Sequence, residues 1–386
     1  MTAKGTGEGL AAVDRLYKDR GSRATELRKQ GNKVIGYFCC YAPVELITAA
    51  NLVPFRIMGN VEQATTEADS YVETIMCPFV RSAFDIGLRG NYSYLDGFVV
   101  PHSCDNIQKI YDIWKYNLKP SFSHFVNVPH TLSGPSLAFF EKELERFKGS
   151  LEKFSGGQIS LESIKEAIRL HNENRALVRQ LYELRKPDPP LVSGAEVIKI
   201  LVAAVSVPVA ESSQLLRSAI DEFKARGGGV EKKGARILLW GPELDDVAFV
   251  QMVEESGANV VADDLCTGSR SYRDDVVLSD GPLSALAKHY LDDITCPRTY
   301  RERTAGRQED LENRFGHLRD LAREFGVNGV IFYIIRFCDT FEFDVPDAKD
   351  FLEKEGIPCL HIEDEYSMVS IARLKTRVQA FLEMIG

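Results

Sequence analysis

The chain has 386 residues, enough for two domains of ordinary size, each with its own core. Its hydrophobic fraction of 44% and charged fraction of 27% are typical of a soluble globular protein, and its net charge of −9 argues against a broad nucleic-acid-binding surface. No apolar run reaches membrane-spanning length and no apolar signal core is present, so we expect a cytoplasmic protein without a membrane partner. Its eight cysteines are then expected to be metal ligands or buried thiols rather than disulfides.

Predicted strands and helices alternate in the first part of the chain. A polar helix over residues 10–30 precedes an apolar strand over 33–38, which leads to Cys39 and Cys40. A helix, a short strand, a helix, a strand, a helix and an edge strand follow, over residues 43–50, 55–59, 79–88, 95–100, 106–117 and 122–128.

Residues 136–223 form a predicted helical insertion, broken at 155–157 and 186–190. A second alternating unit then begins, with strands over residues 235–242, 259–261, 330–335 and 358–362 and helices over 246–256, 282–291, 308–325, 347–355 and 367–385. This alternation predicts an α/β fold with two parallel-sheet, Rossmann-like domains. We place the N-terminal domain with its helical extension at 1–190 and the C-terminal domain at 191–386.

Five of the eight cysteines lie just after predicted strands. The run over residues 330–335 is continuously apolar, which indicates a parallel strand buried on both faces, and it stops shortly before Cys338. The other four are Cys39, Cys40, Cys104 and Cys266. Because ligands bind beyond the carboxyl ends of parallel strands, the sequence predicts a thiolate-lined site at this edge.

Three cysteines precede predicted helices. Pro78 and Pro297 directly follow Cys77 and Cys296, and Cys104 precedes an amphipathic run. A helix N-terminus stabilises a thiolate or an anionic iron–sulfur cluster. No local C-x-x-C pair is present, so any ligands must converge from distant loops.

Two cysteines have competing interpretations. Cys359 is better explained as a small buried hydrophobic residue, whereas Cys40 fits a buried thiol and a ligand equally well. Successive residues at a strand end point to opposite sides, so only one of Cys39 and Cys40 is expected to be a ligand.

The segments over residues 34–46, 77–81, 96–105 and 337–339 resemble the subunits of 2-hydroxyacyl-CoA dehydratases and benzoyl-CoA reductases. The resemblance runs in the same order over nearly the whole chain from Lys33. It implies that Cys77, Cys104 and Cys338 bind a [4Fe–4S] cluster in the cleft between the sheets. It also implies a separate ATP-hydrolysing iron–sulfur activator as electron donor, and this chain has no G-x-x-x-x-G-K-[ST] loop of its own.

Residues 263–270 and 295–298 resemble the double-cubane branch of the family. Members of that branch are homodimers with an [8Fe–9S] cluster, in which two cubanes share a bridging sulfide. The resemblance implies that Cys39, Cys266 and Cys296 hold the added cubane, with Cys39 rather than Cys40 taken as the ligand.

Other polar residues lie near the predicted sheet edge. His102 is a candidate proton donor to substrate, although a structural hydrogen-bonding role is the simpler explanation. Glu45 is a candidate proton relay or fourth cluster ligand, and its simplest explanation is a favourable charge at a helix start. Four arginines lie within a few residues of a cysteine, where they could offset cluster charge, hold an anionic substrate or face solvent: Arg81, Arg270, Arg298 and Arg336.

These features predict an oxidoreductase that performs ATP-coupled, low-potential reduction of a small or CoA-linked substrate on a double-cubane [8Fe–9S] cluster. The first alternative is a lyase or reductase subunit with one [4Fe–4S] cluster, namely a 2-hydroxyacyl-CoA dehydratase or benzoyl-CoA reductase subunit paired with a different second subunit. Cys266 and Cys296 argue against it, because a single cubane leaves them without a role. The second alternative is a non-catalytic electron-transfer or metal-binding protein.

Overall fold

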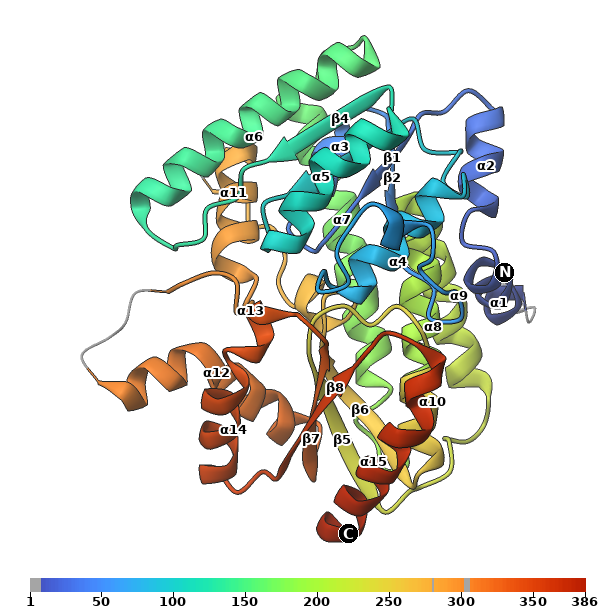
Figure 1. Ribbon diagram of the computed structural model, residues 1–386, viewed down its shortest axis with the longest axis vertical. Helices are drawn as coiled ribbons and strands as arrows, with labels where there is room; N and C mark the ends of the chain where they lie inside the picture. Colours follow the sequence, from blue (N-terminus) through green and yellow to red (C-terminus); the bar gives the residue numbers. More distant parts are fainter. Residues whose placement is uncertain (1–7, 280, 302–305) are drawn as a thin grey trace.

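The computed structural model describes residues 8–279, 281–301 and 306–386. Its strands form two four-stranded sheets, and every strand pair within them is parallel. The first sheet, in the upper half of Figure 1, has the order β2-β1-β3-β4 and consists of β1 (Val34–Tyr37), β2 (Val53–Arg56), β3 (Gly97–Pro101) and β4 (Phe122–Val126). The predicted α/β class with two parallel sheets is confirmed.

The second sheet, in the lower half of Figure 1, has the order β6-β5-β7-β8. It consists of β5 (Ala235–Trp240), β6 (Ala258–Asp264), β7 (Gly329–Ile335) and β8 (Cys359–Asp364). In each sheet the second strand of that half lies at one edge, followed by its first, third and fourth strands. The two halves therefore repeat one topology. All seven residues of β7 are buried, as its uninterrupted apolar sequence predicts.

The helices of the first half lie around the upper sheet, except for the first of them, which packs against the helical insertion. They are α1 (Glu8–Lys18), α2 (Ser22–Lys29), α3 (Val44–Ala49), α4 (Pro78–Leu88) and α5 (Asp105–Leu118). The single helix predicted over residues 10–30 is wrong, because the chain turns between α1 and α2. Arg20 points inward there and donates to the Asp245 carbonyl at 2.7 Å, while Gly21 packs against Tyr94 so closely that a Cβ would lie 2.5 Å from its ring.

The predicted helical insertion consists of α6 (Gly134–Ser155), α7 (Leu161–Glu183), α8 (Gly194–Ala204) and α9 (Val209–Ala225). Serine side chains cap α6, α7 and α8, which explains why these helices begin where they do. The break at residues 205–208 was not predicted, and Pro208 accounts for it because proline cannot continue the hydrogen-bond pattern of α8.

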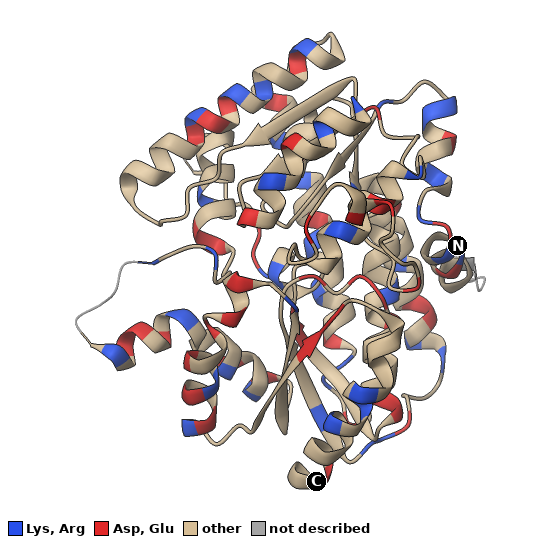
Figure 2. Cartoon of the chain, in the orientation of Figure 1, with Lys and Arg blue, Asp and Glu red and all other residues tan. Residues whose placement is uncertain are grey.

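The second half contributes α10 (Ala248–Glu255), α11 (Pro282–Lys288), α12 (Arg307–Glu324), α13 (Asp339–Glu342), α14 (Val345–Lys354) and α15 (Ile371–Ile385). Helix α1 packs against α8 and α9, and α11 packs against α6, so helices of both halves pack on the helical insertion between them. The strands are largely free of charge, whereas Lys, Arg, Asp and Glu alternate along the outer helices (Figure 2). Among the described residues, none of the helices is long and apolar enough to cross a membrane.

Candidate functional site

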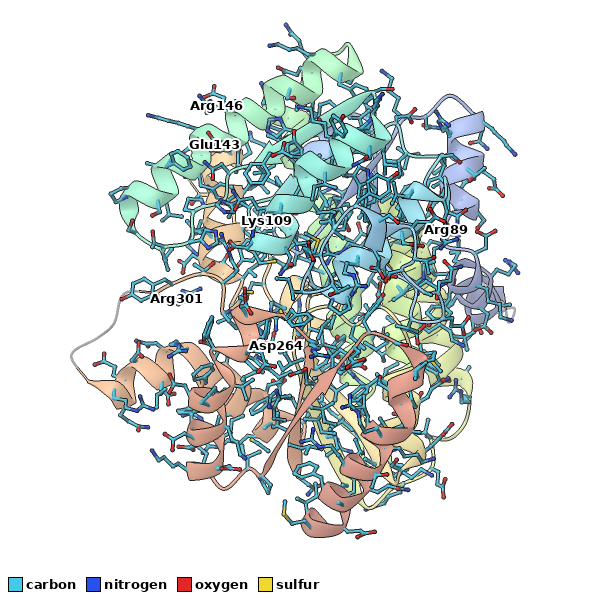
Figure 3. The ribbon with its side chains drawn as sticks, viewed as in Figure 1. Arg89, Lys109, Glu143, Arg146, Asp264 and Arg301 are labelled. Atoms are coloured by element: carbon cyan, nitrogen blue, oxygen red, sulfur yellow. The ribbon has the colours of Figure 1, made fainter. Side chains whose placement is uncertain are left out.

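One cavity collects the loops that follow the carboxyl ends of both sheets. Six cysteines line it, and they are the six predicted ligands: Cys39, Cys77, Cys104, Cys266, Cys296 and Cys338. Apolar side chains complete its wall, among them Phe79, Ile107 and Phe341. We call this space the thiol cavity. Asp264 ends β6, two residues before Cys266. It lies near the middle of the molecule, where the two halves meet (Figure 3).

Three of these cysteines are helix N-caps. Cys77 precedes α4, Cys104 precedes α5 and Cys338 precedes the short helix α13. The backbone amides three residues later, in Val80, Ile107 and Phe341, lie close to these sulfurs and act to lower the pKa of each thiol. We call these three cysteines the cap triad. The prediction that Cys296 also opens a helix is wrong: Cys296 and Pro297 begin a turn, closed by the Thr299 N–H donating to the Cys296 carbonyl at 3.0 Å.

The three sulfurs of the cap triad are mutually close, with Cys77 buried and Cys104 and Cys338 half-buried. Burial raises the pKa of Cys77 to about 11 and that of Cys104 to about 12. Burial also raises the pKa of Cys338 well above its usual range, and the nearby Cys77 and Cys104 thiols raise it further. A positive charge placed among these sulfurs would therefore favour their thiolate forms.

Asn106 connects the three loops of the cap triad. It lies in the first turn of α5, and its Oδ1 accepts from the Cys77 N–H at 3.0 Å. Its Nδ2 reaches the carbonyl of Phe337 at 3.5 Å, directly before Cys338. One side chain thus fixes the spacing of three segments that are far apart in sequence.

The other three cysteines, which we call the loop triad, lie in turns. Cys39 lies two residues after the end of β1. Its φ is 62°, in the left-handed region that non-glycine residues rarely adopt. A hydrogen bond from the Cys40 thiol, more than any other contact, lowers the pKa of Cys39 to about 5. Burial raises the pKa of Cys296 to about 12, although the Arg270 guanidinium opposes this rise, and the Cys266 and Cys39 thiols lie near it.

Arg270 is the buried cation of the loop triad. It is 3% exposed, its Nη1 donates to the Cys266 sulfur at 3.3 Å and its Nη2 pairs with Asp264 at 3.1 Å. Its guanidinium also stacks on Phe341, with 4.9 Å to the ring centroid, and Phe341 packs against Trp240 at the end of β5. The sequence-based suggestion that this arginine offsets charge near a cysteine is consistent with this geometry.

Arg298 has a different role. Its guanidinium donates to four backbone carbonyls, those of His102, Ser103, Val128 and Pro129. It therefore ties the loop of Cys296 to the loops that follow β3 and β4. Arg81 pairs with Asp69 beside Cys77, whereas Arg336 is half-exposed and pairs with Glu363 and Glu365, away from the thiol cavity.

Two polar residues of the thiol cavity were not singled out from the sequence. The Ser103 hydroxyl and the Glu243 Oε1 are buried in its lining without a hydrogen-bond partner. Glu243 pairs through Oε2 with Arg56, and burial raises its pKa to about 7. An acidic residue three positions after the end of β5 is the signal that could have identified Glu243.

The two predicted catalytic residues do not line the thiol cavity. The His102 ring contacts Asn127 through Nδ1 at 3.2 Å and lies 4.5 Å from the His130 ring. Glu45, in the first turn of α3, is fully buried and accepts from Arg175 and from the Tyr290 hydroxyl. Their catalytic roles stay predictions. The contact of His102 fits a structural hydrogen-bonding role, whereas the buried ion pair of Glu45 with Arg175 was not predicted.

The two remaining cysteines do not line the thiol cavity. Cys359 begins β8 in the core of the second half. Cys40 lines only a neighbouring cavity, whereas Cys39 lines both that cavity and the thiol cavity. All eight cysteines are unpaired thiols.

The donor set fits an iron–sulfur cluster. Within the described ranges, no three His, Cys, Asp or Glu side chains are close enough to hold a single metal ion. Six thiols surround one cavity, and thiolates are the ligands that iron–sulfur clusters require. Amides at the starts of α4 and α5 and the buried Arg270 supply the positive potential that an anionic cluster needs.

The fold and the cavity define a class of protein: a two-sheet α/β protein with six cysteines gathered where the carboxyl ends of its sheets meet. The profile of one family, described as 2-hydroxyglutaryl-CoA dehydratase, D-component, matches residues 39–385. The chain belongs to this family, whose curated relatives are dehydratases and reductases, and it is an enzyme of that kind.

The similarity to curated relatives extends over almost the full length of each protein. The chain is 26% identical to the (R)-phenyllactyl-CoA dehydratase beta subunit of Clostridium sporogenes, covering 93% of both chains. It is 26% identical to one of the subunits of benzoyl-CoA reductase from Thauera aromatica, covering 98% of both. It is 25% identical to the beta subunit of the (R)-2-hydroxyglutaryl-CoA dehydratase from Acidaminococcus fermentans, covering 97% of this chain and 99% of the relative.

Proposed function

We propose that this protein is a cytoplasmic iron–sulfur oxidoreductase that reduces a small substrate at low potential on a double-cubane [8Fe–9S] cluster. The observation that carries the proposal is that six thiols, twice the three that one cubane requires from this family, line a single cavity. When bound, the cluster supplies low-potential electrons to the substrate.

The two triads give this proposal its ligand assignment. Among the thiols, Cys77 and Cys104 raise the pKa of Cys338 most. The pKa of Cys296 is instead raised by Cys266 and Cys39. We therefore assign the cap triad to the cubane common to the family and the loop triad to the added cubane. Each triad takes ligands from both halves of the chain, so both halves must fold and associate before either cubane is complete.

The protein residues around the cavity would set the cluster's properties. Arg270 would offset charge at Cys266, and Arg298 would hold the Cys296 loop against the first half. Ser103 and Glu243 each present an unpartnered oxygen-bearing group to the cavity, where they could contact cluster sulfide or substrate.

The electrons would come from a separate ATP-hydrolysing iron–sulfur activator, and the chain would act as a homodimer. Support for the activator comes from membership of a family of CoA-thioester dehydratases and reductases, chemistry that requires very low potentials. The homodimer is what the resemblance to the double-cubane branch implies, and a chain that supplies all six thiols needs no second type of subunit for ligation.

The deciding experiment measures iron and acid-labile sulfide per chain on anaerobically purified protein. A double cubane requires about eight iron with slightly more sulfide, and one cubane requires about four. Cys266→Ser and Cys296→Ser should each lower the iron content, whereas the matched control Cys359→Ser should leave it unchanged. Unchanged iron in both loop-triad variants, or zinc without sulfide, would refute the proposal.

A second candidate is a dehydratase or reductase subunit with one [4Fe–4S] cluster and a different partner subunit. The observation that favours it is that the curated relatives are themselves named as single subunits of larger enzymes, two of them as beta subunits. It predicts about four iron per chain and co-purification with a second polypeptide. Loss of iron from Cys77→Ser alone, with Cys266→Ser unaffected, would select it.

A further inference from the structure

A second cavity adjoins the thiol cavity and encloses about 90 Å³. Cys39 and Cys266 line both spaces, so the two cavities share a wall made by the loop triad. The ligand assignment above leaves this second cavity without a role.

The second cavity is lined by two buried arginines. Arg56 and Arg175 both line it, whereas their partners Glu243 and Glu45 do not. In the described part of the chain no Asp or Glu side chain lines this space. Each ion pair thus presents its guanidinium to the cavity and keeps its carboxylate behind it. Burial lowers the pKa of His171 to about 4, so this lining residue is neutral and the arginines supply the positive charge.

Two buried polar atoms of lining residues lack hydrogen-bond partners. Arg56 is 4% exposed and its Nε–H makes no hydrogen bond, and His289 is 3% exposed with an Nδ1 that makes no hydrogen bond, although an Asp293 carboxylate oxygen lies 3.5 Å away. Buried polar groups in folded proteins are rarely unsatisfied, and an arginine N–H can only donate. The cavity therefore lacks an acceptor for Arg56, and a bound molecule with acceptor atoms would provide one.

The backbone at His289 is also unusual. Residues His289–Asp293 form a π-helical turn directly after α11, and such turns occur frequently at functional sites. This turn brings both His289 and Tyr290 into the lining of the second cavity. Tyr290 in turn donates to Glu45 at 2.6 Å, which fixes the carboxylate that pairs with Arg175.

We propose that the second cavity binds a small monoanion with acceptor oxygens, held by Arg56, Arg175 and His289 beside Cys39 and Cys266. The space corresponds to about three water molecules at ~30 Å³ each, which limits the ligand to a few non-hydrogen atoms. Only the anion's relation to the cluster rests on the proposed function, because the charge and the unpartnered atoms belong to the protein itself. A site so placed would hold a small anionic substrate or co-substrate next to the added cubane.

Formate and formamide provide a matched pair of probes, since they have nearly the same shape and differ in charge. Binding of each to the anaerobically purified full chain would be measured by isothermal titration calorimetry. Formate should bind at least about tenfold more tightly than formamide, because charge-assisted hydrogen bonds to guanidinium are the stronger ones. The same titration on cluster-free chain separates binding in the cavity from binding to iron.

Variants locate the binding. Arg56→Gln should weaken formate binding about tenfold or more, and Arg56→Lys should keep most of it because the charge is retained. His289→Phe removes Nδ1 and its contact with Asp293 without changing a salt bridge of the cavity arginines, so it tests the inference if Arg56→Gln does not fold. Arg336→Gln, far from the second cavity, is the control and should bind formate as the unchanged chain does.

Two outcomes would overturn the inference: no formate binding, meaning that the cavity holds water only, or equal binding of formate and formamide. Unaltered formate affinity in a folded Arg56→Gln or His289→Phe variant would overturn it as well. Failure of the proposed function gives a different result, namely about four iron per chain together with intact, Arg56-dependent formate binding.

Discussion

The cap triad and the loop triad place cysteines around the same cavity by different physical means. In the cap triad, Cys77 and Cys104 directly precede helices of eleven and fourteen residues, whose first-turn backbone amides lie close to the sulfurs. In the loop triad, sulfurs lie in turns and a side chain, Arg270, provides the charge at 3.3 Å from Cys266. Backbone amides are fixed by helix formation itself, whereas a buried arginine depends on its own partners. The cap triad is therefore the more preorganised of the two.

The comparison also explains how one cavity can be built from two similar halves. The first half provides Cys77 and Cys104 to the cap triad and Cys39 to the loop triad. The second half provides Cys266 and Cys296 to the loop triad and Cys338 to the cap triad, which is the reciprocal division. The repeated strand order brings the same sheet edge of each half to the cavity, and the loops determine which sulfurs it receives.

The largest expected effect comes from removing two cysteines of one triad. Cys77→Ser/Cys338→Ser removes two preorganised ligands, and we expect less than about two iron per chain. Cys39→Ser/Cys296→Ser leaves the cap triad intact, and we expect about four iron per chain. Iron and sulfide analysis with Mössbauer spectroscopy checks both. Equal iron contents in the two double variants would contradict the claim that the cap triad is the more preorganised site.

The next effect tests the charge supplied to the loop triad. Arg270→Gln removes a 3%-exposed cation and leaves Asp264, fully buried, with a weaker set of partners. Breaking one side of a buried ion pair costs about 3 kcal/mol or more, so the urea midpoint of the cluster-free chain should fall clearly. Arg336→Gln is the control, because its half-exposed ion pairs contribute less than about 1 kcal/mol. Similar midpoints for the two variants would show that Arg270 is not the supporting cation we describe.

A third effect concerns the ion pair that lies behind the loop triad. Burial is the largest single influence and would raise the pKa of Glu45, but the Arg175 guanidinium, two histidines and the Tyr290 hydroxyl together outweigh it and hold this pKa at about 2 rather than the ordinary value of 4.5. Because the folded-state pKa is lowered, this carboxylate stabilises the fold above pH 4.5, and the contribution is lost as the pH falls towards 2. The difference corresponds to about 3 kcal/mol.

Glu45→Gln should therefore flatten the acid part of the stability curve between about pH 5 and pH 2, measured by urea denaturation at each pH. It should also lower stability at neutral pH, since Arg175 is left buried without its counter-ion. Glu363→Gln, on the exposed end of β8, is the control and should leave the pH dependence unchanged. An unaltered acid slope in Glu45→Gln would mean that other carboxylates govern acid unfolding.

Much of this arrangement is predictable from sequence because strand ends and helix starts are local signals. The apolar run ending near Cys338 and the Cys77-Pro78 pair each specify a place in the fold, and both lie where expected. The Cys296-Pro297 pair carries the same local signal yet forms a turn, since the Arg298 side chain binds carbonyls from the first half and holds the segment there. The hydrogen bond from Arg298 to the His102 carbonyl joins residues 196 positions apart, so no local sequence pattern indicates it.

The polar residues of the site were harder to foresee for the same reason. His102 and Glu45 are candidate catalytic residues because they are close to cysteines in sequence. In the structure, however, their side chains contact Asn127 and Arg175. Glu243 is distant from every cysteine in sequence and still lines the thiol cavity. Proximity in a fold of this kind is decided by which sheet edges meet, and the sheet order is a long-range property.

The smallest expected effect tests the link that joins the cap triad. Asn106→Ala removes the acceptor of the Cys77 N–H, a hydrogen bond of 3.0 Å worth about 1 kcal/mol, and the weaker contact to the Phe337 carbonyl. We expect little change in total iron but a faster loss of iron to a chelator, because the loops of Cys77 and Cys338 are no longer held together. Asn117→Ala is a matched control on the same helix, since that side chain bonds only to the Ile113 carbonyl one turn earlier. If both variants lose iron at the same rate, the cap triad owes its spacing to the helices alone and the difference between the two triads lies entirely in the backbone.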